Sequence, residues 1–140
     1  MKQGLSRTSR RVGVIINYFS LVLFLILFYK LKNGSWNYLI GLGEAVALVI
    51  VIVSFIQTHV KTRLWKLTHA KIDRLDEREI QVTHESLRYS YSIFSIICLV
   101  IIYINAVAEA GPINVLIAAS LLYFAHTLPA SVIAWTEKEI

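Results

Sequence analysis

Cysteine and charged residues are scarce in this chain of 140 residues. Cys98 is the single cysteine, so an intrachain disulfide is excluded and cysteine usage says nothing about the redox compartment. Charged residues make up 16% of the sequence, whereas soluble domains usually contain about a quarter. The hydrophobic residues, 56% of the total, fall in long unbroken runs that a soluble core does not need. The sequence therefore predicts that lipid surrounds most of the chain.

Motifs of common enzyme classes are also missing. The sequence has no Gly-x-Ser-x-Gly nucleophile elbow, no glycine-rich loop to hold a phosphate and no pair of aspartates inside an apolar run. His69 and His84 lie in a polar part of the chain, but their spacing from nearby carboxylates matches no usual pattern of metal ligands. We therefore expect a protein that is not an enzyme, with no catalytic residues and no metal ligands.

Four apolar runs organise what is present, at residues 12–29, 38–58, 89–109 and 113–135. Each is long enough to cross a bilayer as a helix. The first run follows a basic start, as in a signal peptide, but no small-x-small cleavage site comes after it, so we interpret it as a retained span. The sequence predicts an all-α fold, a single integral membrane domain over residues 1–140 built as a four-helix bundle.

Short turn signals separate the runs within each half of the chain. Asn33, Gly34 and Ser35 favour a chain reversal after the first run, and Gly111-Pro112 favours one after the third. Pro129 lies inside the fourth run, where it removes one backbone hydrogen bond and is expected to kink the helix.

The basic residues predict the orientation of the spans. Residues 1–11 contain four basic side chains and the central polar segment, residues 60–88, contains seven. The turn after the first run contains only two, and the turn after the third contains none. Because basic segments stay on the cytoplasmic side, both termini and the central segment are expected in the cytosol.

The central segment has a helical pattern and no glycine or proline. Its apolar residues fall at spacings of seven and three, typical of one helix face: Trp65, Ile72, Leu75, Val82 and Tyr89. Asp76, followed three residues later by Glu79, is the pattern of a capping box at a helix start. We therefore predict that the second span continues as a helix to about Ile72, that the chain turns, and that a new helix from Asp76 enters the third span. The result would be a cytosolic helical hairpin; a short helix lying on the membrane surface is the alternative.

Among the residues of the apolar runs, Glu44 is the one whose transfer into lipid costs the most free energy. An ionised carboxylate in lipid is unfavourable and normally faces a bundle interior or a partner. It indicates either ion or proton handling, or a protonated, hydrogen-bonded side chain that helps helices associate.

A polar stripe follows the third run at spacings of four, three, seven and four: Tyr91, Ser95, Cys98, Asn105 and Glu109. Such a stripe either lines a narrow wet path or bonds to neighbouring helices. Its far end, Asn105 and Glu109, would approach Glu44 if the second and third helices pack together.

His126 lies well inside the fourth run. A neutral imidazole there is a candidate ligand for a haem iron or a chlorophyll magnesium, although no cofactor is predicted as the leading interpretation. The alternative is a structural histidine bonded to a neighbouring helix or to a backbone group freed by Pro129. A bis-histidine haem is disfavoured, because His59 lies at the end of its span and at a different depth.

Charge outside the spans indicates contacts with partners. The exposed clusters expected to dock a partner are Asp76, Glu77 and Arg78 in the central segment and Arg10 and Arg11 near the N-terminus. Nucleic-acid binding is not expected, because acidic residues interleave with the basic ones in the central segment. The net charge of +5 fits membrane topology and contact with anionic lipids instead.

The sequence Asp76-Glu77-Arg78, followed by Ile80 and by Ser90-Tyr91 at the start of the third run, resembles a class of small prokaryotic membrane proteins. Members of that class have four spans and a cytosolic Asp-Glu-Arg motif just before the third. The resemblance covers the architecture and about 15 residues, and it implies no particular activity.

Three functions remain open at this point. The first is a non-catalytic accessory or scaffold subunit of a larger membrane complex, or a small homo-oligomer. The second is a small transporter, channel or proton-coupled sensor that uses Glu44 and the polar stripe of the third run. The third is a pigment- or haem-binding subunit that uses His126. The expected location in each case is a prokaryotic inner membrane, as a multi-pass protein in contact with lipid.

Overall fold

The computed structural model describes residues 6–34, 37–108 and 113–137, and these residues are mostly helical with no strand among them. The elements in chain order are α1 (Arg7–Lys32), α2 (Tyr38–Phe55), the π-helix η1 (Ile56–Val60), α3 (Leu64–His69), the 3₁₀-helix η2 (Ile72–Arg74), α4 (Glu77–Val107) and α5 (Val115–Thr136). The all-α prediction is therefore confirmed for the described part of the chain.

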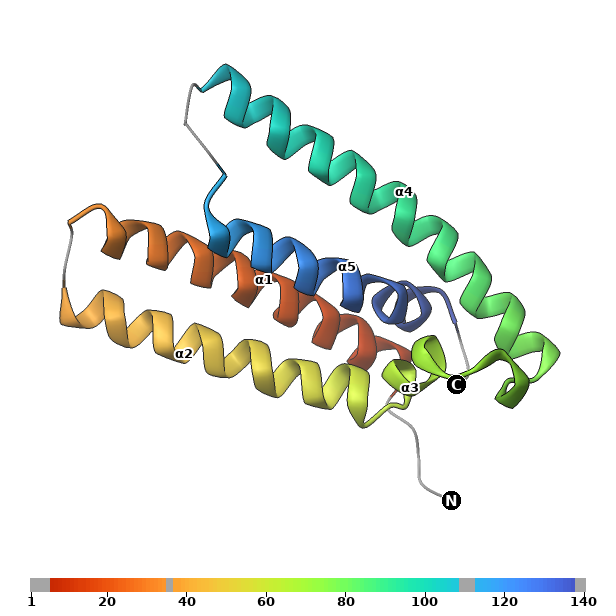
Figure 1. The fold of residues 1–140 in the computed structure, drawn as a ribbon. Coiled ribbons are helices and arrows are strands. Elements are labelled where there is room, and N and C mark those ends of the chain that lie inside the picture. Colours follow the sequence, from red (N-terminus) through yellow and green to blue (C-terminus); the bar gives the residue numbers. More distant parts are fainter. Residues whose placement is uncertain (1–5, 35–36, 109–112, 138–140) are drawn as a thin grey trace. The chain divides into compact units, whose positions relative to one another are not determined.

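Two compact units divide the chain: Met1–Leu64 with Glu137–Ile140, and Trp65–Thr136. The first unit contains α1 and α2, which lie side by side and antiparallel (Figure 1). The second contains α4 and α5, which pack against each other. Each unit thus holds one pair of long helices.

Within the described residues, four helices are long and apolar enough to cross a membrane. They are α1, α2 with η1, α4 and α5, so the chain has the helices of a multi-pass membrane protein. At 1.5 Å per residue, the 31 residues of α4 extend about 46 Å, more than the roughly 30 Å of a hydrocarbon core. The charged residues of α4 all fall in its first twelve positions, which account for the length of α4 in excess of a hydrocarbon core.

Each of these helices begins at a polar side chain that accepts a hydrogen bond from a free backbone N–H of the first turn. Ser6 accepts from Ser9 N at 3.2 Å at the start of α1, and Asn37 accepts from Leu39 N at 3.0 Å at the start of α2. Asn114 accepts from Leu116 N at 3.0 Å before α5. These caps explain why the helices begin where they do.

The predicted capping box at the start of α4 is confirmed. The Asp76 carboxylate accepts from Glu79 N at 2.7 Å, and the Glu79 carboxylate accepts from Asp76 N at 3.1 Å. The 3₁₀ turn of η2 and the extended Leu75 precede it. The new helix therefore starts at the predicted point and runs without a break into the third span.

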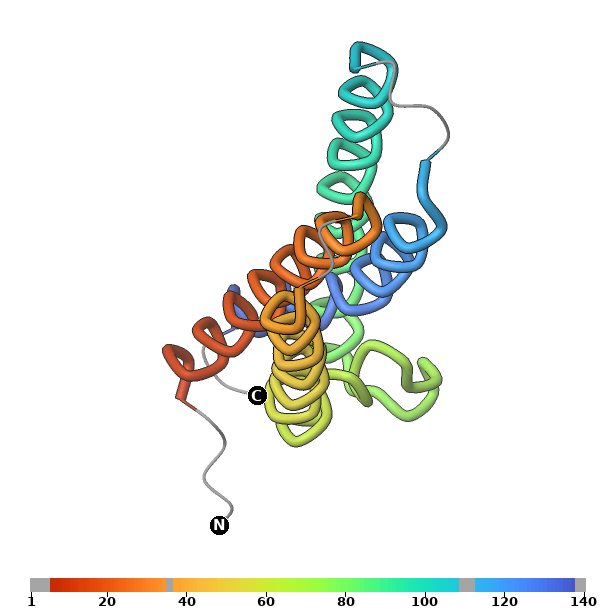
Figure 2. Tube along the Cα trace, turned by 90° about the vertical axis from the view of Figure 1, so that its left-hand side faces the viewer, coloured from red at the N-terminus to blue at the C-terminus, as the bar shows by residue number. Residues whose placement is uncertain are grey.

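The predicted continuation of the second span to Ile72 is wrong. The α-helix ends at Phe55, η1 ends at Val60, and Arg63 has a φ of 65° that interrupts the helix before the short α3. Figure 2 shows this part of the chain turning between α2 and α4. A left-handed backbone at a residue other than glycine is uncommon, so helical propensity gave no warning of the break.

Glycine lets α1 and α2 approach closely. A side chain on Gly13 would collide with Thr58 of η1, and one on Gly43 would lie 3.4 Å from Leu27 Cδ1. These two contacts fix an antiparallel register in which the start of α1 meets the end of the second span. The chain reversal predicted between α1 and α2 begins as expected at Asn33 and Gly34, where Gly34 has a φ of 87°.

Pro129 lies inside α5, which continues through it to Thr136. The side chains around Pro129 are buried, from Thr127 to Ser131. Gly111 and Pro112, the turn predicted before this helix, lie outside the described residues.

Candidate functional site

A buried polar cluster joins α1 to the second span. The Asn17 side chain is 0% exposed and donates from Nδ2 to Val51 O at 3.0 Å and to Ser54 Oγ at 2.9 Å. Ser54 Oγ in turn donates to Val51 O at 3.1 Å. A buried amide is costly unless it is hydrogen-bonded, and here both donated bonds cross between the two helices. The cluster is therefore an interhelical clamp.

The π-helix η1 continues this cluster toward the end of the span. Thr58 and His59, both within η1, are buried, and the His59 ring stacks on Phe55 with centroids 5.4 Å apart. A π-turn adds one residue to a helical turn and so rotates the side chains that follow it. In this chain the insertion places Thr58 against Gly13 and turns the next residue, His59, inward as well.

Arg10 was predicted to dock a partner, yet its side chain is buried. It is 3% exposed, and Nη2 donates to the backbone carbonyl of Glu137 at 3.0 Å. This bond lies within the first unit and satisfies a carbonyl after the end of α5. Arg11, the other predicted docking residue of this region, is half-buried.

The intramembrane polar residues predicted to meet are divided between the two units. Glu44 is half-buried on α2, in the first unit. Asn105 is half-buried on α4, in the second unit, where Nδ2 donates to Ile101 O of its own helix at 3.4 Å. Glu109 lies outside the described residues. Neither unit by itself therefore brings these groups together.

His126 is exposed on α5, and its Nδ1 lies 3.0 Å from Leu122 O of the same helix. The residues that the structure describes contain no group of three or more His, Cys, Asp or Glu side chains that could hold a metal ion. The geometry around His126 is thus that of a single imidazole on a helix surface.

Asp76, Glu77 and Arg78 are exposed at the start of α4. Asp76 has a structural task as the helix cap, so the first residue of this motif is explained by local folding. The other two residues of the motif, Glu77 and Arg78, are exposed, and their predicted role in docking stays a prediction.

An exposed stripe runs along α4 and was not predicted. Its residues follow spacings of three and four: Tyr89, Ser92, Ile96, Leu99 and Tyr103. Tyr103 is 70% exposed and Leu99 is 66% exposed. We refer to these five residues as the outer stripe of α4. The predicted polar stripe lies elsewhere on the helix, with Ser95, Cys98 and Asn105 half-buried, although Tyr91 is exposed.

The Asn17 clamp also escaped the sequence analysis. Two signals were present: an asparagine inside an apolar run, and small or polar residues at spacings of four and three around it, from Gly13 through Asn17 to Ser20. The residues that accept hydrogen bonds from Asn17 could not be predicted, because an amide can bond to any carbonyl or hydroxyl on any neighbouring helix.

Comparison with protein-family models, with curated proteins and with solved structures found no match to this chain.

Proposed function

We propose that this protein is a non-catalytic accessory or scaffold subunit of a larger membrane assembly, and that α4 is its docking helix. The observation that supports this proposal is the outer stripe of α4. Its spacing of three and four residues is that of helix pairs packed side by side. The stripe faces away from the half-buried side of α4, which carries Phe94, Ile97 and Ile101.

The composition of the outer stripe favours a protein neighbour over lipid. Tyr103 lies one turn from the end of α4, and Ser92 lies one turn inside the apolar part. Ser92 Oγ donates to Arg88 O at 3.2 Å, so its hydroxyl can still accept a bond from a neighbour. Polar side chains on membrane helices commonly hydrogen-bond across helix interfaces.

The polar groups inside the first unit favour a structural role over catalysis. Asn17 and Ser54 are engaged in bonds to each other and to a backbone carbonyl. Glu44, the one acidic residue of the first two apolar runs, has no second carboxylate on α1 or α2. A proton- or ion-handling site usually contains several convergent ionisable groups, and α1 and α2 together provide one carboxylate.

Site-specific photocrosslinking in native membranes tests the proposal. A photoreactive phenylalanine analogue at Leu99 should form adducts with a larger membrane protein, visible as bands well above the 15.9 kDa of the chain. The same analogue at Val22, which is 54% exposed on α1, is the matched control. Mass spectrometry of the Leu99 adduct then identifies the partner.

The outcomes separate the candidate functions. Adducts at Leu99 but not at Val22 would support docking through α4. An adduct at twice the mass of the chain would assign the stripe to a homo-oligomer. If neither position captures protein, and the extracted chain runs alone as a monomer, the accessory-subunit proposal fails.

A further inference from the structure

Three basic side chains follow the second span within six residues. The span ends at Val60, and Lys61, Arg63 and Lys66 come next; all three are exposed. The chain has no acidic residue between Glu44 and Asp73, so nothing nearby in sequence neutralises them. A group of cations with no acidic neighbour in the sequence, held at the end of a span, is expected at the depth of the lipid headgroups.

The helix break at Arg63 prevents the second span from continuing as one helix into the basic stretch. Because Arg63 has a φ of 65°, the second span does not continue outward as a straight helix. The chain turns instead, and α3 is only six residues, about 9 Å, long. Lys66 is therefore separated from Val60 by only a short stretch of chain.

Trp65 adds a second feature typical of a membrane interface. Its ring is half-buried and stacks on His69, with centroids 4.0 Å apart and an interplanar angle of 24°. Tryptophan is enriched at the headgroup level, where both its apolar body and its N–H are accommodated. The stacked pair holds the indole in the middle of the basic sequence.

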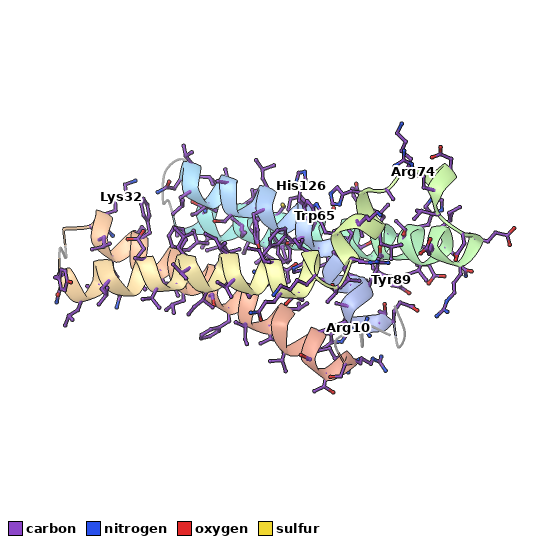
Figure 3. The ribbon with its side chains drawn as sticks, turned by 90° about the horizontal axis from the view of Figure 1, so that it is seen from below. Arg10, Lys32, Trp65, Arg74, Tyr89 and His126 are labelled. Atoms are coloured by element: carbon purple, nitrogen blue, oxygen red, sulfur yellow. The ribbon has the colours of Figure 1, made fainter. Side chains whose placement is uncertain are left out.

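The charge changes sign farther along the chain. From Lys61 to Leu75 five residues are basic and one is acidic, whereas from Asp76 to Arg88 four are acidic and two are basic. Lys71 and Arg74 belong to the first stretch but lie next to the start of α4 in the sequence. Figure 3 shows Arg74 on this turn, with its side chain extending away from the ribbon.

We propose that the contiguous sequence Lys61–Lys66 binds the headgroups of anionic phospholipids through the basic side chains of Lys61, Arg63 and Lys66, with Trp65 next to Lys66 in the sequence. The ammonium and guanidinium groups would contact the lipid phosphate, and the indole would lie at the boundary with the acyl chains. This site is separate from the outer stripe of α4, so it stands whether or not a protein docks there.

Fluorescence quenching by brominated lipids tests the site in the full chain. In a W36F/W135F variant, Trp65 is the single tryptophan. The variant is reconstituted in vesicles of equal parts phosphatidylglycerol and phosphatidylcholine, with bromine on the acyl chains of one lipid or of the other. The bulk composition is then the same, and any excess quenching by the brominated anionic lipid measures its enrichment next to Trp65. We expect enrichment of about fivefold or more, because each basic side chain near an anionic surface contributes about that factor.

Two charge variants locate the site. K61Q/K66Q should lower the enrichment severalfold, because it removes two of the three basic side chains of this stretch and retains Arg63. K71Q/R74Q removes the same charge farther along the chain and should leave most of the enrichment. Arg63 is retained in both variants, since its φ of 65° makes the turn sensitive to substitution.

A salt series requires no charge substitution. Raising the salt from about 0.1 M to about 1 M shortens the screening length from roughly 10 Å to 3 Å, so the enrichment should fall severalfold. Equal quenching by both lipids at low salt would overturn the proposal. An equal loss in the two charge variants would also overturn it, because the effect would then follow net charge alone.

Discussion

The two helix pairs of this protein use their polar side chains in different ways. In the α1–α2 pair, Asn17 reaches across to Val51 O and Ser54 Oγ. In the α4–α5 pair, Ser90 donates to Ser86 O at 2.6 Å and Asn105 donates to Ile101 O, both on their own helix. A bond between helices fixes their register, whereas a bond to the preceding turn adds nothing to the fit between helices.

This difference indicates that the two helix pairs have different structural roles. The first pair has a close glycine contact and an interhelical clamp, and α1 and α2 make the more extensive contact of the two pairs. Helix association in lipid depends on such packing and hydrogen bonding, because the hydrophobic effect does not drive it. In the second pair, the side-chain bonds of Ser90 and Asn105 stay within α4, and this helix carries the outer stripe. We infer that the packing between α1 and α2 is more stable than the packing between α4 and α5.

Filling the space at Gly13 should produce the largest effect on this comparison. In Gly13→Val the new side chain would collide with Thr58, whose Cβ and Cγ2 lie 3.2 and 3.3 Å from an ideal Cβ at this position. Thr58 belongs to a packed helix, so η1 would have to move away from α1. We expect about 2 kcal/mol of destabilisation, measured by reversible unfolding in mixed micelles.

Gly41→Val is the matched control, because nothing lies within 4 Å of an ideal Cβ at Gly41. It makes the same chemical change in a helix that could span the membrane, without a collision. If both variants lose the same stability, then the intrinsic cost of valine in a helix would explain the loss. The close contact between Gly13 and Thr58 would then make no measurable contribution to stability.

Removing the clamp should have the next largest effect. Asn17→Leu deletes both interhelical bonds while roughly preserving volume, and Val51 O still receives the bond from Ser54 Oγ. We expect a loss of about 1 kcal/mol, since interhelical hydrogen bonds in membranes contribute about 0.6 to 2 kcal/mol. The free energy of unfolding in mixed micelles measures it.

Asn105→Leu applies the same substitution to the second pair. Its amide bond stays within α4, so the variant should change stability by less than about 0.5 kcal/mol. A larger loss at Asn105 than at Asn17 would reverse the comparison and make α4–α5 the pair that depends on polar contacts.

The features that could be predicted from the sequence are those determined locally. Runs of apolar residues predict the long helices because each run alone is long enough to cross lipid. The capping box at Asp76 was predictable for the same reason, since both of its bonds join residues three positions apart. No information about a second helix was required.

The features that could not be predicted depend on two distant segments or on an unusual backbone. The partner of Asn17 lies 34 residues away, and its identity follows from a register set by Gly13 and Gly43. The break at Arg63 requires a left-handed backbone at a residue other than glycine. The sequence signals that predict turns do not include an arginine in this conformation. The outer stripe of α4 could be recognised only after the other faces of α4 had been assigned.

The smallest predicted effect compares two buried serines. Ser54, 8% exposed, accepts from Asn17, whereas Ser90, 5% exposed, donates to the carbonyl one turn back. Ser54→Ala should cost about 0.5 to 1 kcal/mol, because Asn17 loses one acceptor and keeps Val51 O. Ser90→Ala should be neutral within about 0.5 kcal/mol, because the Ser86 carbonyl keeps its bond within the helix.

Reversible unfolding of both variants in the same micelles separates the two roles of a buried hydroxyl. If Ser90→Ala were as costly as Ser54→Ala, then Ser90 would have to contact something besides its own helix. That result would give the second pair an interhelical polar contact of its own and remove the distinction between the pairs. The combined N17L/S54A variant sharpens the result: it should lose less than the sum of the two single losses, because both substitutions break the bond between Asn17 and Ser54.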